Sequence, residues 1–112
     1  MDCLFCKIGS GEIPAKELYR DGEIVAIADL NPQAPTHALV MPLAHHNDLA
    51  ALYDGGGDAL ASRLFAVAAK LGRERGTRGF RLVVNTGDEG GQTVGHVHVH
   101  VLAGRRMTWP PG

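Results

Sequence analysis

The chain has 112 residues, of which 45% are hydrophobic and 21% charged, and this composition is typical of a globular domain and excludes a wholly disordered chain. Eleven basic and twelve acidic residues leave a net charge of −1, so the overall charge favours neither nucleic acid nor a membrane surface as partner. No stretch approaches the ~20 apolar residues of a membrane span and no secretory signal opens the chain, so we expect one cytoplasmic domain over residues 1–112.

The first half of the chain begins with two cysteines and continues with strand patterns. Cys3 and Cys6 form a C-x-x-C pair, which in a reducing compartment suggests metal ligation or redox chemistry and leaves the choice between them open. Residues 16–20, followed by Asp21-Gly22, predict a hairpin arm and a tight turn. Residues 23–28 and 36–41 are short apolar runs that predict two strands. The glycine-rich residues 54–58 then mark a break.

The second half predicts one long helix and two paired strands. Apolar residues recur at helical spacing between residues 58 and 75, with Asp58 as the expected N-cap and Gly76 as the stop. Residues 80–85 and 96–102 predict strands, joined by a glycine-rich loop at 87–95. Hairpin-connected strands with a single long helix indicate an α+β fold, in which the helix covers one face of an antiparallel sheet.

Three of the six histidines alternate with valine at residues 96–100. Because side chains alternate along a strand, the three imidazoles share one face and the valines pack on the other. Such a row can ligate a metal such as zinc, or one imidazole can attack an electrophile while its neighbours position charge. The preceding loop carries Gln92-Thr93 near its end and offers donors for phosphate oxygens, which favours phosphorus as the electrophile.

Residues 96–102 match the pattern His-φ-His-φ-His-φ-φ, where φ is apolar, and thereby resemble the signature of the histidine triad (HIT) family. Residues 28–37, 83–85, 91–93 and 109–112 further resemble the Hint branch of that family. The resemblance runs from about residue 3 to the C-terminus. It implies a HIT-like fold of about five antiparallel strands with a long helix and a short N-terminal helix, paired into a homodimer.

The resemblance also implies a reaction. In this family the middle histidine is the nucleophile, which assigns His98 to attack on the α-phosphorus of a purine nucleoside phosphoramidate such as adenosine monophosphoramidate. Attack would expel the amine and leave a nucleotidyl-histidine, which water hydrolyses to the nucleoside monophosphate, AMP for the adenosine substrate. His100 would stabilise charge on the phosphate, and Thr93, where the family usually has serine, would pass a proton to the amine. The nucleotide-binding residues implied are Asp29, Leu30, His37, Asn85, Gly91, Gln92 and Trp109.

By the same resemblance, Cys3, Cys6, His45 and His96 correspond to a structural zinc site, and two thiolates with two imidazoles suit tetrahedral zinc. The neighbour His46 leaves that assignment open by one position, and two buried free thiols are the alternative. No organic cofactor is expected. Three other functions remain open: a dinucleoside polyphosphate hydrolase, a nucleotide-binding regulator that acts through a partner protein, and an enzyme whose three histidines form a catalytic metal centre.

Overall fold

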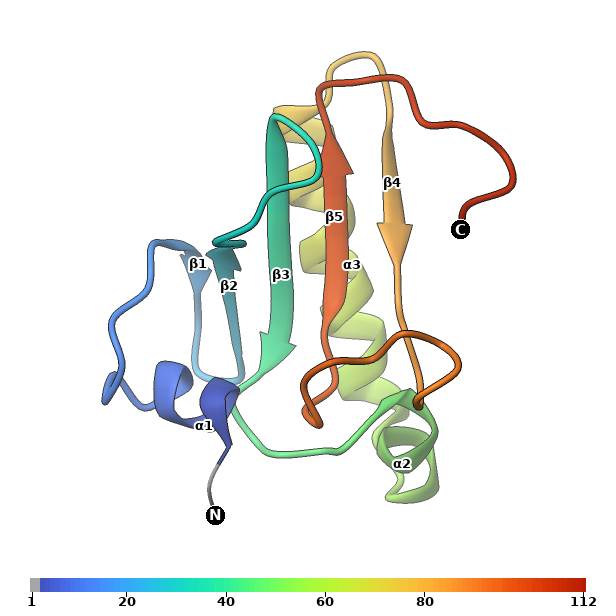
Figure 1. Cartoon of the computed structure of the whole chain (residues 1–112). Helices are drawn as coiled ribbons and strands as arrows, with labels where there is room; N and C mark the ends of the chain where they lie inside the picture. The colour runs from blue at the N-terminus through green and yellow to red at the C-terminus, as the bar shows by residue number, and fades with distance from the viewer. Residues whose placement is uncertain (1–2) are drawn as a thin grey trace.

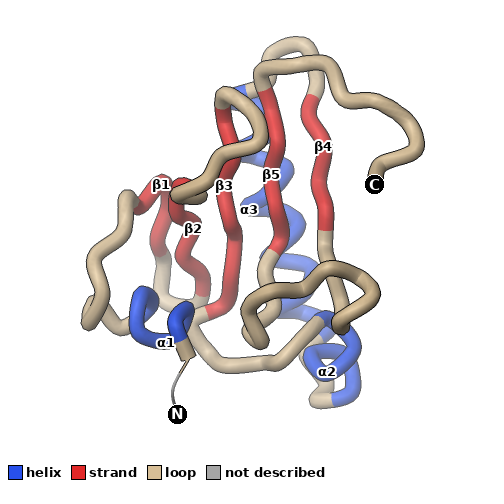
Figure 2. The backbone as a smooth tube through the Cα atoms, in the orientation of Figure 1, coloured by secondary structure: helices blue, strands red, loops and turns tan. Residues whose placement is uncertain are grey.

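The structure, a computed structural model, describes residues 3–112. In chain order the elements are α1 (Leu4–Gly9), β1 (Glu17–Arg20), β2 (Ile24–Ala28), β3 (Thr36–Pro42), α2 (Leu49–Asp54), α3 (Asp58–Arg75), β4 (Phe80–Val83) and β5 (Val99–Ala103). The five strands form one antiparallel sheet in the order β1-β2-β3-β5-β4 (Figures 1 and 2). The predicted α+β fold, with its long helix and its short N-terminal helix, is confirmed.

The two faces of the sheet are covered by different helices. On one face α3 crosses the sheet (Figure 1) and packs against apolar residues that alternate along β3, β5 and the segment before β5, among them Ala38, Val97, Val99 and Val101. On the other face α1 packs Phe5 and Ile8 over a second apolar cluster: Val25, Ile27, Leu39 and Met41. Each large side chain buried in this way stabilises the fold by about 1.5–3 kcal/mol. The predicted alternation therefore holds, because the valines of residues 97–101 face α3 and leave the histidines on the face that α1 covers.

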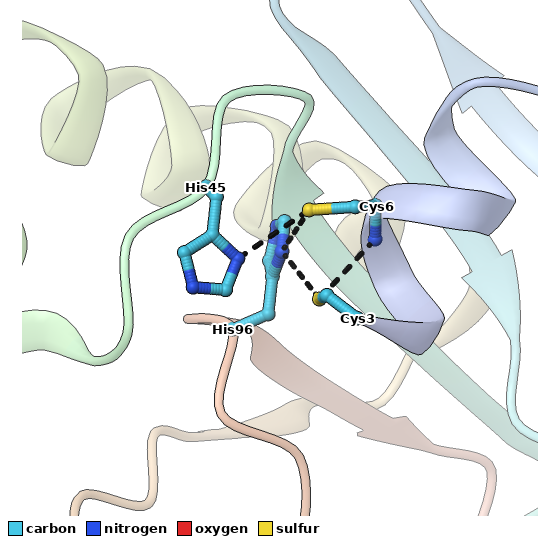
Figure 3. Close-up of side chains that lie close together, drawn as sticks. All are labelled: Cys3, Cys6, His45 and His96. Carbon is cyan, nitrogen blue, oxygen red and sulfur yellow. Dashed lines mark hydrogen bonds between the residues drawn. The ribbon is translucent and has the colours of Figure 1, made fainter. Parts of the chain in front are cut away.

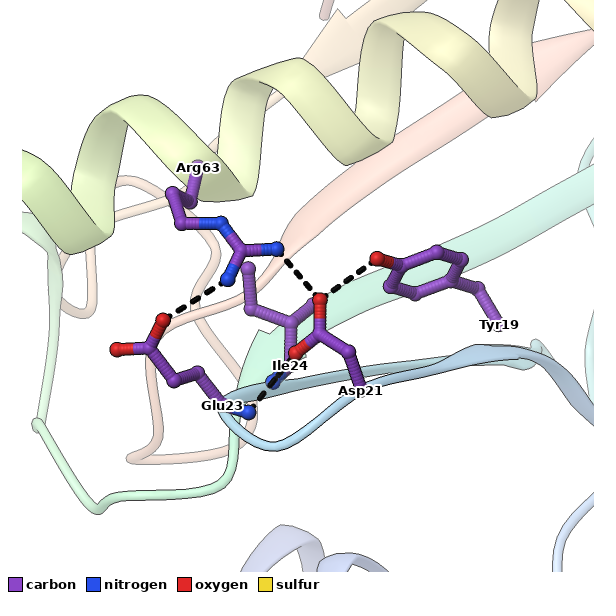
Figure 4. Close-up of polar contacts among 5 residues, drawn as sticks. All are labelled: Tyr19, Asp21, Glu23, Ile24 and Arg63. Atoms are coloured by element: carbon purple, nitrogen blue, oxygen red, sulfur yellow. Dashed lines mark hydrogen bonds and ion pairs between the residues drawn. The ribbon is translucent and has the colours of Figure 1, made fainter.

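The β1–β2 hairpin is tied to α3 through Asp21 at its turn (Figure 4). One carboxylate oxygen of Asp21 accepts the backbone N–H groups of Glu23 and Ile24 at 2.8 and 2.9 Å, which closes the predicted turn. The other oxygen accepts the Tyr19 hydroxyl at 2.6 Å and pairs with Arg63 of α3. These donors, the Tyr19 hydroxyl foremost, hold the pKa of Asp21 well below its usual range. The carboxylate that anchors the hairpin to the helix is therefore ionised at neutral pH.

Helix bounds differ from the prediction at two places. The long helix begins at Asp58 with Gly57 at its N-cap, so the expectation that Asp58 is the cap was wrong by one residue. The short helix α2 was not predicted, since its six residues are fewer than helical periodicity needs to show itself. Asp48 caps α2 by accepting the backbone N–H of Ala51 at 2.8 Å. Among the described residues, no helix is both long and apolar enough to cross a membrane.

Strand bounds also differ beside the histidines. The last strand begins at Val99 rather than at residue 96, because the Val97 N–H donates to the His46 carbonyl at 2.8 Å instead of joining the ladder with β3. The strand before it ends at Val83 rather than at residue 85. The first two histidines of the row therefore lie in the segment that leads into β5.

Candidate functional site

Four imidazoles gather on the sheet face that α1 covers. His37 lies on β3, His100 lies on β5, and His96 and His98 lie just before β5. The Phe5 ring meets the His98 ring edge-on, with 5.0 Å between the ring centroids. His96 and His98 are buried, and the His98 and His100 rings are neighbours with 5.0 Å between centroids. The hydrogen bonds of these rings decide which nitrogen of each carries the proton.

His98 keeps a free lone pair on Nε2. Its Nδ1 lies 2.8 Å from the carbonyl oxygen of His96, and because a carbonyl oxygen only accepts, Nδ1 must carry the proton. In the neutral ring the lone pair is then on Nε2, which has no hydrogen-bond partner among residues 3–112. This is the protonation pattern that a nucleophilic imidazole needs.

His37 and His100 are joined by a hydrogen bond, and each carries its proton on Nε2, whereas His98 carries its proton on Nδ1. The backbone N–H of Gln33 donates to His37 Nδ1 at 3.0 Å, so the His37 proton lies on Nε2. His37 Nε2 is 2.9 Å from His100 Nδ1, which therefore accepts, and the His100 proton lies on Nε2. That His100 Nε2 is the one fully buried side-chain nitrogen or oxygen without a partner in the described part of the chain. An unpaired buried N–H is costly, and a ligand oxygen would satisfy it.

The His37 and His100 rings are both neutral at pH 7. Burial, aided by the nearby His98 and His37 rings and opposed by Asp29, lowers the pKa of His100 to about 4. Burial likewise lowers the pKa of His37, again opposed by Asp29. His100 consequently acts as a neutral N–H donor.

The loop after β2 brings a carboxylate and an apolar side chain to this site. Asp29 Oδ1 accepts the backbone N–H of Asn31 at 2.8 Å, while Oδ2 lies 3.5 Å from His37 Nε2. Asp29 thus closes a local turn and still presents its second oxygen beside the histidines. The next residue, Leu30, has a fully exposed side chain. An exposed leucine next to a carboxylate gives the loop one apolar and one polar contact for a ligand.

The glycine-rich loop differs from the expectation at Gln92. Its side-chain amide donates to the carbonyl oxygens of Asn47 and Val94 at 2.7 and 3.0 Å and accepts the Gly87 N–H at 2.9 Å. Gln92 therefore braces the loop, and neither of its amide hydrogens is free for a phosphate. Several backbone N–H groups of the loop bond to no acceptor within residues 3–112, and those of Thr93, Val94 and Gly95 are the ones next to the histidines in the chain.

The remaining predicted residues lie at the periphery. Gly91 has φ +81°, a left-handed turn conformation that favours glycine. Thr93 is exposed and lines a cleft with Cys3 and His45. Asn85 is half-buried and lies two residues beyond the end of β4. Trp109 is 82% exposed in the C-terminal segment, which Figure 1 shows leaving the sheet on the β4 side, so within this single chain it does not join the histidines.

A second cluster joins α1 to the segment before β5 (Figure 3). The metal-binding atoms of Cys3, Cys6, His45 and His96 all lie within 4.8 Å of one another. The S···N separations are 3.4 Å from Cys3 Sγ to His96 Nδ1, 3.4 Å from Cys6 Sγ to His45 Nδ1, and 3.6 Å from Cys6 Sγ to His96 Nδ1. Tetrahedral zinc, with Zn–S of about 2.3 Å and Zn–N of about 2.05 Å, requires S···N edges of about 3.6 Å. The four residues therefore fit zinc, and His46 is not among them.

The outer hydrogen bonds of this cluster also suit a metal. His96 Nε2 donates to the Pro42 carbonyl at 2.8 Å, and His45 Nε2 bonds to Asn47 Oδ1 at 2.8 Å, so both lone pairs lie on the Nδ1 atoms that face the sulfurs. Burial, together with the neighbouring Cys3, raises the pKa of the Cys6 thiol. A divalent cation would compensate the charge of the thiolates. Sequence reasoning missed Asn47, which carries no motif that would mark it.

The three histidines of the row do not converge on one metal position. His96 turns its Nδ1 toward the cysteines, whereas His98 Nδ1 donates to a carbonyl. Asp29, His37 and His100 form a separate group of potential ligand atoms within 4.8 Å, but two of those nitrogens are joined by the hydrogen bond between His37 and His100. The geometry therefore does not favour a catalytic metal centre built from the row itself.

Comparison with known proteins shows the family of the chain. The family model described as the HIT domain matches residues 10–107, and the chain belongs to the HIT family. It is 45% identical to a HIT family hydrolase of Legionella pneumophila, with a TM-score of 0.94 over 99% of this chain and 100% of that one. It is also similar to a histidine triad protein of Clostridium difficile, at 43% identity and a TM-score of 0.89 over 96% of this chain and 95% of that one.

A sequence relative bears on the cysteine cluster. The 14 kDa zinc-binding protein of Brassica juncea is 39% identical over 99% of this chain and 100% of its own length. An uncharacterised HIT-like protein of Synechococcus elongatus is 43% identical over 99% of this chain and 97% of its own length. Family membership supports a hydrolytic or nucleotide-binding function in general terms.

Proposed function

We propose that the protein is a purine nucleoside phosphoramidase, which hydrolyses nucleoside 5'-monophosphoramidates through a nucleotide bound covalently to His98. The observation that carries the proposal is the opposite protonation of two neighbouring rings. His98 offers a lone pair on Nε2, and His100 offers an unpaired N–H. Together they supply a nucleophile for phosphorus and a donor for the oxygens that gain charge during attack.

In the first step His98 Nε2 attacks the α-phosphorus and the bond from phosphorus to the amine nitrogen breaks. The amine leaves with a proton taken from solvent water, which the hydroxyl of Thr93 is proposed to relay by giving its own proton to the amine and taking one from the water. His100 Nε2–H and the free backbone N–H groups of residues 93–95 donate to the non-bridging oxygens. The phosphoryl-bearing ring keeps its Nδ1 proton and is positively charged, and the His96 carbonyl stabilises that charge.

In the second step water attacks the phosphorus and gives up one proton to the solvent, the bond from phosphorus to His98 Nε2 breaks, and the electron pair returns to the ring. The products are the nucleoside monophosphate and the regenerated enzyme. Asp29 is suited to accept the ribose hydroxyls and Leu30 to contact the base. Asn85, half-buried just after β4, would help to orient the substrate.

Zinc and a second subunit complete the proposal. Zinc bound by Cys3, Cys6, His45 and His96 would cross-link α1 to the segment before β5, and the printed name of the Brassica juncea relative supports this assignment. A homodimer is supported by the open edge strand β4 and by the 82% exposure of Trp109. In such a dimer the C-terminal segment would reach toward the partner's site.

A product assay tests the reaction. Wild type and His98→Ala are each given adenosine 5'-monophosphoramidate or a diadenosine polyphosphate, and AMP binding is measured by calorimetry. The proposal expects AMP and ammonia from the phosphoramidate with wild type only, and AMP binding by both proteins. Preferred cleavage of the diadenosine substrate would favour the polyphosphate hydrolase instead. AMP binding without turnover of either substrate by wild type would favour a nucleotide-binding regulator.

A further inference from the structure

The segment that follows β5 contacts the loop between β2 and β3 through two adjacent residues, Gly104 and Arg105. Gly104 has φ +99°, and a Cβ atom there would lie 2.8 Å from Cβ of Pro35, so glycine allows the two segments to pack closely. The next residue, Arg105, donates from Nε to the carbonyl oxygen of Gln33 at 2.7 Å. These two contacts fix the C-terminal end of the loop that begins at Asp29.

Gln33 connects Arg105 by hydrogen bonds both to His37 on β3 and to Asp29 in the loop. Its backbone N–H donates to His37 Nδ1 at 3.0 Å, the bond that sets the His37 tautomer. Its side-chain amide donates to the Asn31 carbonyl at 3.0 Å, and the Asn31 N–H donates to Asp29 Oδ1 at 2.8 Å. A continuous series of hydrogen bonds thus leads from Arg105 to His37 and to Asp29.

We propose that Arg105 is a positioning residue for the phosphoryl-transfer site, an inference that rests on the proposed function. By holding the Gln33 carbonyl, Arg105 keeps the Gln33 N–H directed at His37 Nδ1. Without that donor, His37 is free to carry its proton on Nδ1 and its lone pair on Nε2. His100 would then have to protonate Nδ1 to keep its bond to His37, and its Nε2 could no longer donate to a phosphate oxygen.

The contact is directional rather than a general effect of positive charge. Arg105 is exposed and forms no ion pair with a carboxylate of the described residues. Its second hydrogen bond, from Nη1 to the Arg106 carbonyl at 3.1 Å, holds the guanidinium plane in place. The side chain of Arg106 is also exposed but makes no such contact within residues 3–112. Arg106 therefore offers a matched control of equal charge.

The test compares Arg105→Gln, Arg105→Lys and Arg106→Gln in the full chain, each checked for an unchanged circular dichroism spectrum. Nitrogen-15 NMR at pH 7 without substrate reports the tautomers of His37 and His100, and steady-state kinetics follow with adenosine 5'-monophosphoramidate. We expect Arg105→Gln to shift both rings toward a mixture of tautomers and to lower kcat/KM about tenfold, the effect of losing one hydrogen bond from a charged donor. Arg105→Lys should recover part of both effects, and Arg106→Gln should change neither.

Unchanged ring spectra and unchanged kcat/KM in Arg105→Gln would overturn the proposal, as would equal effects of Arg106→Gln. Failure of the proposed reaction gives a different result. If wild type hydrolyses no phosphoramidate, the NMR comparison and the affinity for AMP still test Arg105. The positioning role then requires both the tautomer shift and a several-fold weaker binding of AMP by Arg105→Gln.

Discussion

Replacing His100 with asparagine should make the folded protein less sensitive to acid. Burial lowers the pKa of His100 from 6.5 to about 4. Below pH 6.5 the His100 ring therefore binds a proton in the unfolded chain but stays neutral in the folded protein. The free energy of unfolding consequently decreases as the pH falls from 6.5 toward 4. Asparagine does not titrate, and its amide oxygen can still accept the His37 Nε2 proton. The variant should lack this part of the acid sensitivity.

The magnitude follows from the same shift. At pH 5 the solution lies about 1.5 units below the unfolded pKa and still above the folded one, which corresponds to about 2 kcal/mol at 1.36 kcal/mol per unit. Because the ring is only partly buried, solvent screening reduces this value to about 1 kcal/mol. Urea unfolding of wild type and His100→Asn at pH 7 and pH 5 measures it. We expect the free energy of unfolding of wild type to fall by about 1 kcal/mol more than that of the variant.

Other groups that titrate in this range, among them His37 and His96, are present in both proteins, so their effects largely cancel in the comparison. Equal losses of stability in wild type and variant would refute the reasoning. His100 would then be charged in the folded protein and could not be the neutral donor described above.

The remaining predictions concern the cysteine cluster and the loop. Replacing Cys3 and Cys6 together with serine should remove bound zinc and lower Tm by about 15 °C, since a metal at 1,000 times its Kd stabilises a small domain by ~4 kcal/mol. Thermal unfolding measures the Tm, and elemental analysis measures the zinc content. If wild type as purified holds no zinc and has the same Tm as the variant, the prediction is wrong. Leu30→Ala should leave Tm within about 2 °C, because the side chain is fully exposed, and should raise KM for the nucleoside substrate. A KM equal to that of wild type would show that Leu30 does not contact the base of the substrate.

Much of the fold follows from local patterns in the sequence. Alternation of valine and histidine over residues 96–101 predicts which side chains face α3, and the structure agrees. The periodicity of residues 58–75 predicts the long helix, which ends before Gly76 as expected. These features depend on residues within one element, where side-chain spacing and backbone geometry are directly linked.

Features that depend on contacts between distant segments were not predictable. The choice of His45 over His46 arises only when the loop after β3 folds against α1. Gln92 looked like a phosphate donor, yet its amide is taken by the Asn47 carbonyl, 45 residues earlier in the chain. The bond from Arg105 to Gln33 joins residues 72 positions apart. No local motif marks such pairs, so only the assembled fold reveals them.

The central claim is that His98 Nε2 becomes covalently bound to the nucleotide. Its most direct test is mass spectrometry of protein quenched during turnover of adenosine 5'-monophosphoramidate, with wild type and His98→Ala compared and the modified peptide sequenced. The account predicts an added adenylyl group on His98 of wild type and none on the variant. Rapid turnover by wild type without any adenylyl adduct, or turnover by His98→Ala close to that of wild type, would contradict it.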